Sequence, residues 1–370
     1  MNTKFSYDYS IIALVTILST YGIVMMYSAS AIIAINHFDN YLYFLKKQLF
    51  WFILGFLLMW ICMNINYRHL KSFAYPLIFL SFIFLFMGYF FKGPNPASRW
   101  LIIGGRSLMT TSDFARISLI IFTAYFIDAN RKNIHQWTFL LKNYTPYFLG
   151  TILLILFQPD TSTTLVISLI IIVMLFIGGS SGKYLLGLIT IGLSGVMTKI
   201  LLTDYQWKRI LSWKAGNIDY QKIHSFNAFG NGGLTGNGLG DSIIKNGFLP
   251  QAHTDFILPI IGEELGFLGI LILFVLFWQL YKNGILISKN APDTFSMLLS
   301  FGIIASIMIY FLVNASYAVG YAPTTGLPMP FISYGGSHTI FNLISIGILV
   351  SIARNNKMSR NSYLGYNYEL

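Results

Sequence analysis

The residues best suited to chemistry lie in one polar stretch, residues 225–264, of an otherwise apolar chain. Six glycines fall within Gly230–Gly240, and Asp255 precedes an apolar segment that carries Glu263 and Glu264. The chain has only 13 acidic residues, and three of them lie within ten positions here. Charged side chains at the start of a membrane segment are costly, so their clustering predicts a functional site.

Asp255 is the sharpest candidate for a functional carboxylate. It directly precedes an apolar helix, so either Asp255 or Thr254 is also suited to be the helix N-cap. The helix dipole would lower the pKa of this carboxyl, whereas an apolar site at the membrane edge would raise it. Because the sequence does not decide between these effects, both interpretations stay open.

Further acidic candidates lie inside the apolar segments. We expect Glu263 and Glu264 to face the interior of the helix bundle and to find polar partners there, in a structural or a functional network. Asp160 follows Gln158 and Pro159 at a break between two apolar runs. It is suited to cap the next helix, and a proline-broken junction with a carboxylate is also how membrane proteins form polar sites at depth.

Three basic residues and one histidine complete the candidates. Arg99, Arg209 and Lys245 are suited to hold a pyrophosphate, or equally to form loop salt bridges and contacts with lipid headgroups. His253 is either a ligand or orienting group for Asp255 or a hydrogen-bonded structural residue. The glycine run contains neither a G-x-G-x-x-G pattern nor a P-loop, so it predicts flexible backbone close to a ligand and no nucleotide site.

Composition sets the class of protein. Apolar residues make up 55% of the 370-residue chain and charged residues only 10%, and the mean hydropathy is +0.64. These values exclude an ordinary soluble domain and indicate a polytopic helical membrane protein.

The formal net charge is +11, but the basic residues are scattered over loops. This pattern favours anionic lipids or phosphate-bearing substrates as partners and does not favour nucleic acid. The single cysteine, Cys62, excludes an intramolecular disulfide.

Hydrophobic runs predict an all-α fold with about ten transmembrane helices in a single membrane domain, residues 1–370. We expect these helices at about 10–35, 48–66, 72–91, 114–128, 146–158, 160–178, 183–202, 256–281, 296–318 and 336–353. An even number of spans puts both termini on one side. Basic residues in the short connections on that side favour a cytoplasmic location for both termini.

Three connections on the opposite, outer side are too long or too irregular to be simple turns. They are residues 92–113, the large loop 203–255 between the seventh and eighth helices, and the uncharged, Pro- and Gly-rich segment 320–335. Irregular outer loops are where a protein with otherwise short loops usually binds its ligands. Pro159 marks the one helix break that we expect, and no inverted repeat is evident.

The motifs in these loops resemble those of the SEDS family of bacterial shape, elongation, division and sporulation proteins, typified by FtsW, RodA and SpoVE. The polar stretch carries Ala228-Phe229-Gly230, Gly236-Asn237-Gly238-Leu239-Gly240, Leu249-Pro250, Ala252-His253-Thr254-Asp255-Phe256-Ile257 and Gly262-Glu263-Glu264-Leu265-Gly266. Elsewhere the resemblance rests on Arg99-Trp100, Gln158-Pro159-Asp160, Asn314, Gly320, Pro323, Gly326 and the run from Pro330 to Ser337. It covers essentially the full length of the chain.

Some positions depart from the family pattern. Asp113 and Arg116 stand where a glutamate and a lysine are usual, so charge is kept there, and His338 departs from the last signature. None of the departures touches Asp255. The short segment 238–242 and the alanine before His253 make the chain more like the FtsW/SpoVE branch than RodA.

The resemblance implies a peptidoglycan glycosyltransferase that uses lipid II as donor and acceptor and extends a nascent β-1,4 glycan strand. It implies that Asp255 acts as the base or as ligand of a divalent cation, Mg²⁺ or Mn²⁺, with no organic cofactor. The residues assigned to substrate binding on this basis are Arg99, Arg209, Lys245, Asp160, His253 and Ser333.

The family also implies a partner and a place in the cell. The partner would be a class B penicillin-binding protein, a transpeptidase, together with other proteins of the division machinery. The place would be the outer face of the bacterial cytoplasmic membrane, at the division septum. The alternatives are a RodA-type polymerase for sidewall elongation, a lipid II flippase, for which paired broken helices would be expected, and a non-catalytic scaffold.

Overall fold

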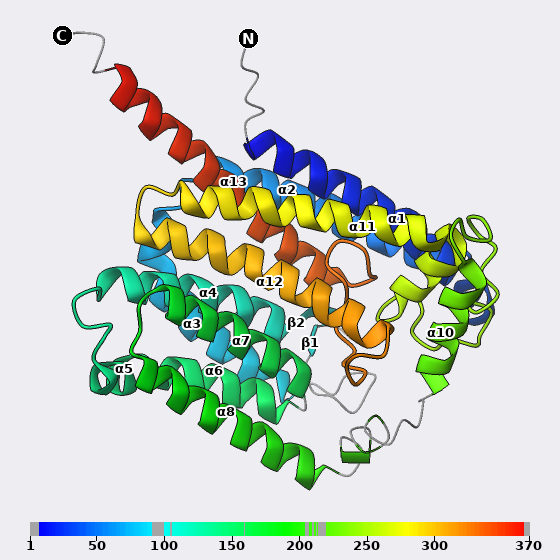
Figure 1. Cartoon of the computed structure of the whole chain (residues 1–370), viewed down its shortest axis with the longest axis horizontal. Coiled ribbons are helices and arrows are strands. Elements are labelled where there is room, and N and C mark those ends of the chain that lie inside the picture. The colour runs from blue at the N-terminus through cyan, green and yellow to red at the C-terminus, as the bar shows by residue number, and fades with distance from the viewer. Residues whose placement is uncertain are drawn as a thin grey trace.

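The protein is a bundle of long helices (Figure 1). The computed structural model describes residues 7–90, 100–103, 106–158, 160–203, 207, 208, 211, 213 and 220–365. The first helices are α1 (Tyr7–Phe38), α2 (Tyr43–Asn64), α3 (His69–Gly88) and α4 (Thr111–Ala129). They are followed by α5 (Trp137–Asn143), α6 (Thr145–Phe157), α7 (Thr161–Ile177) and α8 (Gly182–Leu202). The remaining helices are α10 (Tyr220–Gly232), α11 (Ile257–Lys289), α12 (Thr294–Ala318) and α13 (Gly336–Gly365).

Every one of the ten predicted segments is helical, which confirms the all-α fold class. Among the described residues, seven helices are long and apolar enough to cross a membrane, or eight if the bent pair α5 and α6 forms one span. Helix α7 is shorter, with 17 residues, and α4 carries Asp113, Arg116 and Asp128. A helix satisfies its own backbone hydrogen bonds, which is why long apolar segments adopt it in lipid.

Helix α12 joins two groups of helices. On one side α2 packs against α1 and α13, and α11 packs against α1. On the other side α3 packs against α4 and α6, and α7 packs against α4, α6 and α8. Helix α12 contacts α11 and α13 in the first group and α4 and α7 in the second, and it lies between them in Figure 1.

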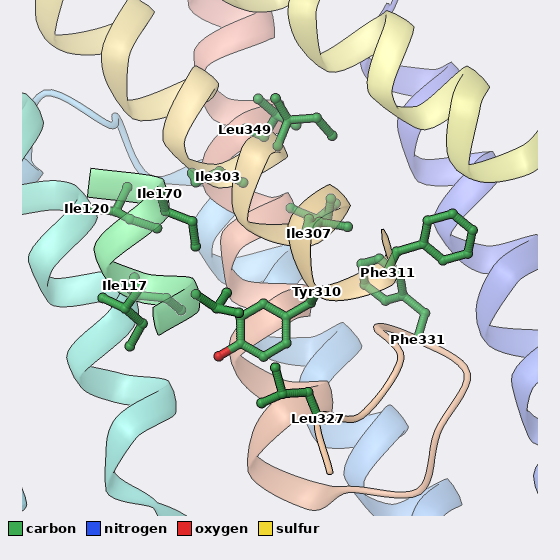
Figure 2. Close-up of a cluster of buried hydrophobic side chains, with 14 of the residues drawn as sticks. Ile117, Ile120, Ile170, Ile303, Ile307, Tyr310, Phe311, Leu327, Phe331 and Leu349 are labelled. Carbon is green, nitrogen blue, oxygen red and sulfur yellow. The ribbon is translucent and has the colours of Figure 1, made fainter. Parts of the chain in front are cut away.

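The hydrophobic core is centred on α12. Ile303, Ile307 and Phe311 are each at most 2% exposed. Figure 2 shows Ile303 and Ile307 near α4, α7 and α13, with the hydroxyl of Tyr310 pointing to the side of α4 and α7. Phe311 lies on another side of α12, where its ring stacks on that of Phe277 of α11 at 4.0 Å. The loop after α12 also enters this core through Leu327. An outer loop is therefore held by the same packing that joins the two groups of helices.

Two of the three outer connections contain more structure than we predicted. The first includes an antiparallel pair of strands, β1 (Trp100–Ile103) and β2 (Arg106–Thr110), with a register irregularity after Leu101. The large loop between α8 and α11 contains α10, which packs against α11. Figure 1 shows α10 at one end of the bundle and α5 at the opposite end.

The expectation of a single helix break is wrong. Besides the junction between α6 and α7, helix α11 is broken at Gly266, whose φ of 65° and ψ of −165° are not helical. In addition, α5 and α6 meet at an angle of 55°. Only glycine adopts such a positive φ at little cost, so the Gly-Phe sequence at this point allows the break.

Candidate active site

The break in α11 is closed by backbone from the glycine run. At Gly266 the helix loses hydrogen bonds on both sides, and unpaired backbone groups inside a membrane protein are costly. The segment 233–238 replaces those bonds. Asn237 N–H donates to Glu263 O and Gly238 N–H to Glu264 O, each at 3.0 Å, while Phe267 N–H donates to Gly233 O at 2.9 Å and Leu268 N–H to Leu234 O at 3.1 Å.

The glycines allow this backbone to approach closely. A Cβ at Gly232 would lie 1.9 Å from Gly262 O, and one at Gly236 would lie 2.2 Å from Glu264 O. Gly236 also has a φ of +80°. We predicted flexible backbone near a ligand, but at these two positions the glycines instead pack against the protein's own broken helix.

Glu263 is buried and bound on three sides. It is 0% exposed. Its carboxylate accepts hydrogen bonds from Ser242 Oγ, from Asn231 Nδ2 at 3.2 Å and from Ile244 N–H at 3.3 Å. The expectation that this glutamate faces the interior and finds polar partners is confirmed, and these three partners belong to the large outer loop or to α10.

Glu264 forms a buried ion pair with Lys245. Lys245 Nζ lies 2.7 Å from Glu264 Oε1 and also donates to Gly240 O at 2.6 Å and to Ser28 Oγ at 2.9 Å. Ser28 of α1 in turn donates to the Glu264 carboxylate at 2.6 Å. An ammonium has three donors, and all three are used here. In this arrangement Lys245 fastens the loop to the bundle and has no donor left for a pyrophosphate.

Asp255 lies in a tight turn before α11. Gln251, with a φ of 59°, accepts hydrogen bonds through its carbonyl from the N–H groups of residues 254, 255 and 256. Helix α11 begins at Ile257, and its N-cap residue is Phe256. The interpretation of Asp255 or Thr254 as the N-cap is therefore wrong, because the turn places the start of the helix further along the chain.

Two buried side chains of α12 fix the backbone of Asp255. Asn314 Nδ2 donates to Asp255 O at 3.0 Å, and Tyr317 OH donates to the same oxygen at 2.8 Å. Asn314 Nδ2 also donates to Leu327 O at 2.7 Å, and the single hydroxyl hydrogen of Tyr317 is shared between Asp255 O and Leu327 O, the latter at 2.9 Å. The turn at Asp255 is thereby held against the loop 320–335. A Cβ at Gly326 would lie 3.3 Å from Asp255 Oδ2, so this loop passes directly beside the partly exposed carboxylate.

His253 is a packed structural residue. Its ring lies 4.6 Å from the ring of Phe44 and 5.7 Å from that of Tyr334, and its carbonyl accepts from Tyr334 N–H at 2.9 Å. It is 8% exposed, and burial lowers the pKa of its imidazole to about 4. His253 is therefore neutral near pH 7.

The remaining predicted site residues serve local structure or fall outside the described residues. Asp160 caps α7 by accepting from Thr163 N–H at 3.2 Å, which confirms its capping role. Ser333 Oγ is buried and accepts from Met329 N–H at 2.9 Å. Arg99 and Arg209, like Pro159, lie outside the described residues.

Comparison with known proteins identifies the family. The model of a family described as "Cell cycle protein", which comprises FtsW, RodA and SpoVE, matches residues 8–358. The chain belongs to this FtsW/RodA/SpoVE family. It is 37% identical over 359 residues to a protein of Geobacter metallireducens named probable peptidoglycan glycosyltransferase FtsW, with 94% of each chain covered. It is 35% identical over 363 residues to stage V sporulation protein E of Bacillus subtilis, covering 95% of this chain and 98% of that one.

Solved structures agree with this assignment. A chain from a structure described as structural coordination of polymerization and crosslinking by a peptidoglycan synthase complex has a TM-score of 0.78 at 25% identity, covering 95% of this chain and 99% of that one. The rod shape determining protein RodA of Thermus thermophilus shares the fold, with a TM-score of 0.71 at 24% identity and coverage of 96% and 99%. The predicted resemblance, with its leaning towards FtsW and SpoVE, is confirmed.

Three of the positions at which the chain departs from the FtsW/RodA/SpoVE pattern, Asp113, Arg116 and His338, belong to a second buried polar cluster, which the sequence did not reveal. Asp113 of α4 binds two residues of α13, His338 Nδ1 and Ser337 Oγ, each at 3.1 Å. Arg116 donates through one Nη to Asn342 Oδ1 at 3.0 Å and lies 4.7 Å from the ring of Tyr310. The three-residue spacing of Asp113 and Arg116 was the available signal, because it puts both on one face of α4.

Arg116 keeps unused hydrogen-bond donors. It is 1% exposed, and its Nε and one of its Nη atoms have no partner in the described part of the chain. Tyr310, beneath its guanidinium, lies seven residues before Tyr317 on α12, which is two turns or roughly 10 Å along the axis. The Arg116 guanidinium therefore packs on α12 at Tyr310, and the Asp255 turn packs on the same helix at Tyr317.

Replacing Gly236 tests the closure of the α11 break. Gly236→Ala should lower the unfolding free energy by more than about 3 kcal/mol, because a side chain there collides with Glu264 O at a positive φ. Gly240→Ala is the matched control. Gly240 has a φ of +91° but nothing within 4 Å of an added Cβ, so the cost should be only about 1 kcal/mol. Thermal unfolding of the purified proteins measures both variants. An equal loss of unfolding free energy in Gly236→Ala and Gly240→Ala would show that the close contact at Gly236 is unimportant.

Replacing Lys245 separates a structural role from a substrate role. Lys245→Met should destabilise the protein by about 3–5 kcal/mol, because it leaves the Glu264 carboxylate buried without its cation. Replacing both residues with apolar ones, Lys245→Met with Glu264→Leu, should recover most of that loss. A single variant with wild-type thermal stability but no activity would instead assign Lys245 to the substrate.

His253 predicts a dependence of stability on pH. The folded-state pKa of about 4 lies below the ordinary value of 6.5, so the unfolded state takes up the proton first as the pH falls. The neutral histidine contributes fully to the unfolding free energy above about pH 6.5. This contribution falls as the pH is lowered, and the loss amounts to about 3 kcal/mol at pH 4. His253→Phe keeps the aromatic packing and removes the titration, so its thermal midpoint should fall less than that of the wild type between pH 7 and 4. Parallel curves for the two proteins would contradict this assignment.

Proposed function

We propose that the protein is a peptidoglycan glycosyltransferase that polymerises lipid II into β-1,4 glycan strands for septal cell-wall synthesis. The observation that carries the proposal is Asp255. Asp255 is a partly exposed residue whose carboxylate lies beside Gly326, and its backbone is fixed by two buried side chains of α12. A rigidly placed, accessible carboxylate at the meeting of two outer loops is what a general base requires. The relatives that are named peptidoglycan glycosyltransferases support the choice of reaction.

The proposed reaction joins two lipid II molecules. The 4-hydroxyl of the acceptor GlcNAc attacks C1 of the donor MurNAc, the bond from C1 to the undecaprenyl pyrophosphate breaks, and the configuration at C1 inverts. Asp255 takes the proton of the attacking hydroxyl. A positioned base of this kind typically contributes 10²- to 10⁴-fold to the rate. The negative charge that develops goes to the leaving pyrophosphate, which needs cations nearby.

Basic side chains are proposed to hold that pyrophosphate. Arg99 and Arg209 keep this role as proposals. Arg116 is an additional candidate, because its buried guanidinium has donors that meet no partner among the described residues, and a guanidinium suits a phosphate geometrically. Lys245 would act indirectly by holding the outer loop in place through Glu264.

A divalent cation, Mg²⁺ or Mn²⁺, is proposed to assist at Asp255. Among the described residues there is no group of three or more His, Cys, Asp or Glu side chains placed to hold a metal. This fits a cation bound by one carboxylate together with substrate phosphates, as is usual for Mg²⁺. When bound, such a cation would neutralise charge on the pyrophosphate. Asp255 is the residue that would hold it.

The protein is proposed to lie in the cytoplasmic membrane, with both termini in the cytoplasm and Asp255 on the outer face at the septum. We also propose a class B penicillin-binding protein as its partner, alongside other division proteins. The similar chain from a complex described as coordinating polymerization and crosslinking supports such a pairing. Relatives named FtsW support the septum over sidewall elongation.

A lipid II flippase is the second candidate, because one observation favours it. The break at Gly266 in α11 accompanies the junction between α6 and α7, and paired broken helices are typical of transporters. However, loop backbone closes the break at Gly266. This closure favours the polymerase over a path through the bundle.

Replacing Asp255 tests the proposed function. Purified protein with its partner, whose transpeptidase is blocked, should make glycan chains from lipid II in the presence of Mg²⁺. Asp255→Asn should reduce the rate by at least about 100-fold, because the amide cannot accept the proton. Asp241→Asn is the matched control, since Asp241 is an exposed carboxylate of the same outer loop, and its rate should stay unchanged.

The result is interpretable only with folded protein, so thermal unfolding and partner binding are measured for each variant. Near-normal synthesis by a well-folded Asp255→Asn protein would remove Asp255 from catalysis. If the wild type makes no polymer in a stable complex but moves labelled lipid II across vesicles, the flippase is correct. If it does neither, the scaffold interpretation replaces both.

A further inference from the structure

A cavity of about 330 Å³ lies between α3, α4, α5 and α6. Figure 1 shows α5 at the end of the bundle opposite α10, so this cavity is remote from the proposed active site. It is lined by four aromatic rings, a lysine and two amides. The members used below are Tyr75, Phe126, Phe139, Lys142 and Tyr147.

The aromatic side of the cavity continues onto the lateral surface of the bundle, which faces lipid. The ring of Tyr147 lies 5.8 Å from that of Tyr75 and 6.0 Å from that of Phe79, one turn further along α3. Tyr75 is 39% exposed and Phe79 is 52% exposed. Large apolar side chains exposed on a membrane helix face lipid tails. The cavity therefore opens towards the acyl region of the membrane.

The polar side of the cavity carries positive charge. In the described chain, no carboxylate lies within ion-pair distance of Lys142. Asp128, near the end of α4, is already bound by Lys71 at 2.8 Å and by Arg131 at 2.5 Å. Lys132 and Lys142 are both exposed on this end of the bundle. An anionic group is the ligand that would balance Lys142.

Helix α5 has the character of a membrane-interface helix. It is bent by 55° from α6, and its Trp137 is 50% exposed and its Leu141 42% exposed. Tryptophan and lysine on a short helix at the end of a bundle are typical of the headgroup level, where rings sit in the lipid and amines reach phosphates. The cavity beneath α5 thus lies where phospholipid headgroups are found.

We propose that this cavity binds one anionic phospholipid, with its headgroup phosphate on Lys142 and the start of an acyl chain along Tyr75 and Phe79. The rings of Phe126, Phe139 and Tyr147 enclose the glycerol region. The lipid would tie α5 to α3 and α4. This site is independent of Asp255, and it stands or falls separately from the glycosyltransferase assignment.

Native mass spectrometry of the full-length protein, released from detergent after incubation with phosphatidylglycerol, tests the proposal. The wild type should retain one phosphatidylglycerol in preference to phosphatidylcholine. Lys142→Ala should lower that retention about fivefold, in line with the contribution of one basic residue beside an anionic lipid. Lys142→Arg should keep it, because the charge remains. Lys132→Ala is the matched control: this exposed lysine does not line the cavity, and its removal should change nothing.

Thermal unfolding in lipid-free detergent confirms that the variants are folded. The proposal is overturned if Lys142→Ala and the control lose lipid equally, or if the wild type retains the two lipids equally. A third arm adds inorganic phosphate at millimolar concentration. Displacement of phosphatidylglycerol by phosphate alone would show that the site takes a free oxyanion and would overturn the lipid assignment.

Discussion

The break of α11 at Gly266 determines how the end of the bundle that carries Asp255 is built. Backbone groups inside a membrane protein must be paired, and here the partners come from the segment 233–238. That pairing requires glycine where the two backbones meet. It also fixes the large outer loop against the helix that follows Asp255. The break at Gly266 therefore explains the need for glycine at positions 232 and 236 and the position of the loop.

The acidic side chains in the bundle differ in what they bind. Glu263 and Glu264 are enclosed by hydrogen bonds and by Lys245, which makes them anchors for the outer loop. Asp113 joins α4 to α13. Asp255 differs from them because the residue is partly exposed while its backbone oxygen is held by α12. A group that is rigid at its base and accessible at its tip is suited to accept a proton from a bound hydroxyl.

Helix α12 connects these features. It supplies the core residues that join the two groups of helices, and near its end Asn314 and Tyr317 hold the Asp255 turn and Leu327 together. Leu327 is itself 3% exposed within the core. Changes in how the bundle packs around α12 would therefore be transmitted to the loop beside Asp255.

The membrane class, the positions of the long apolar helices and the region of the site could be read from the sequence, because long apolar runs and scarce charges are local features of a chain. The motifs around Asp255 also sufficed to identify the family. The roles of the polar residues became clear from the folded structure. Lys245 pairs with Glu264 and with Ser28, which is 217 positions away, and Asp113 meets His338 across 225 positions. The start of α11 depends on a turn at Gln251. The two strands depend on pairing with each other, which a pattern of apolar residues does not indicate. Such contacts depend on how helices pack, and packing is set by the whole set of side chains at each interface.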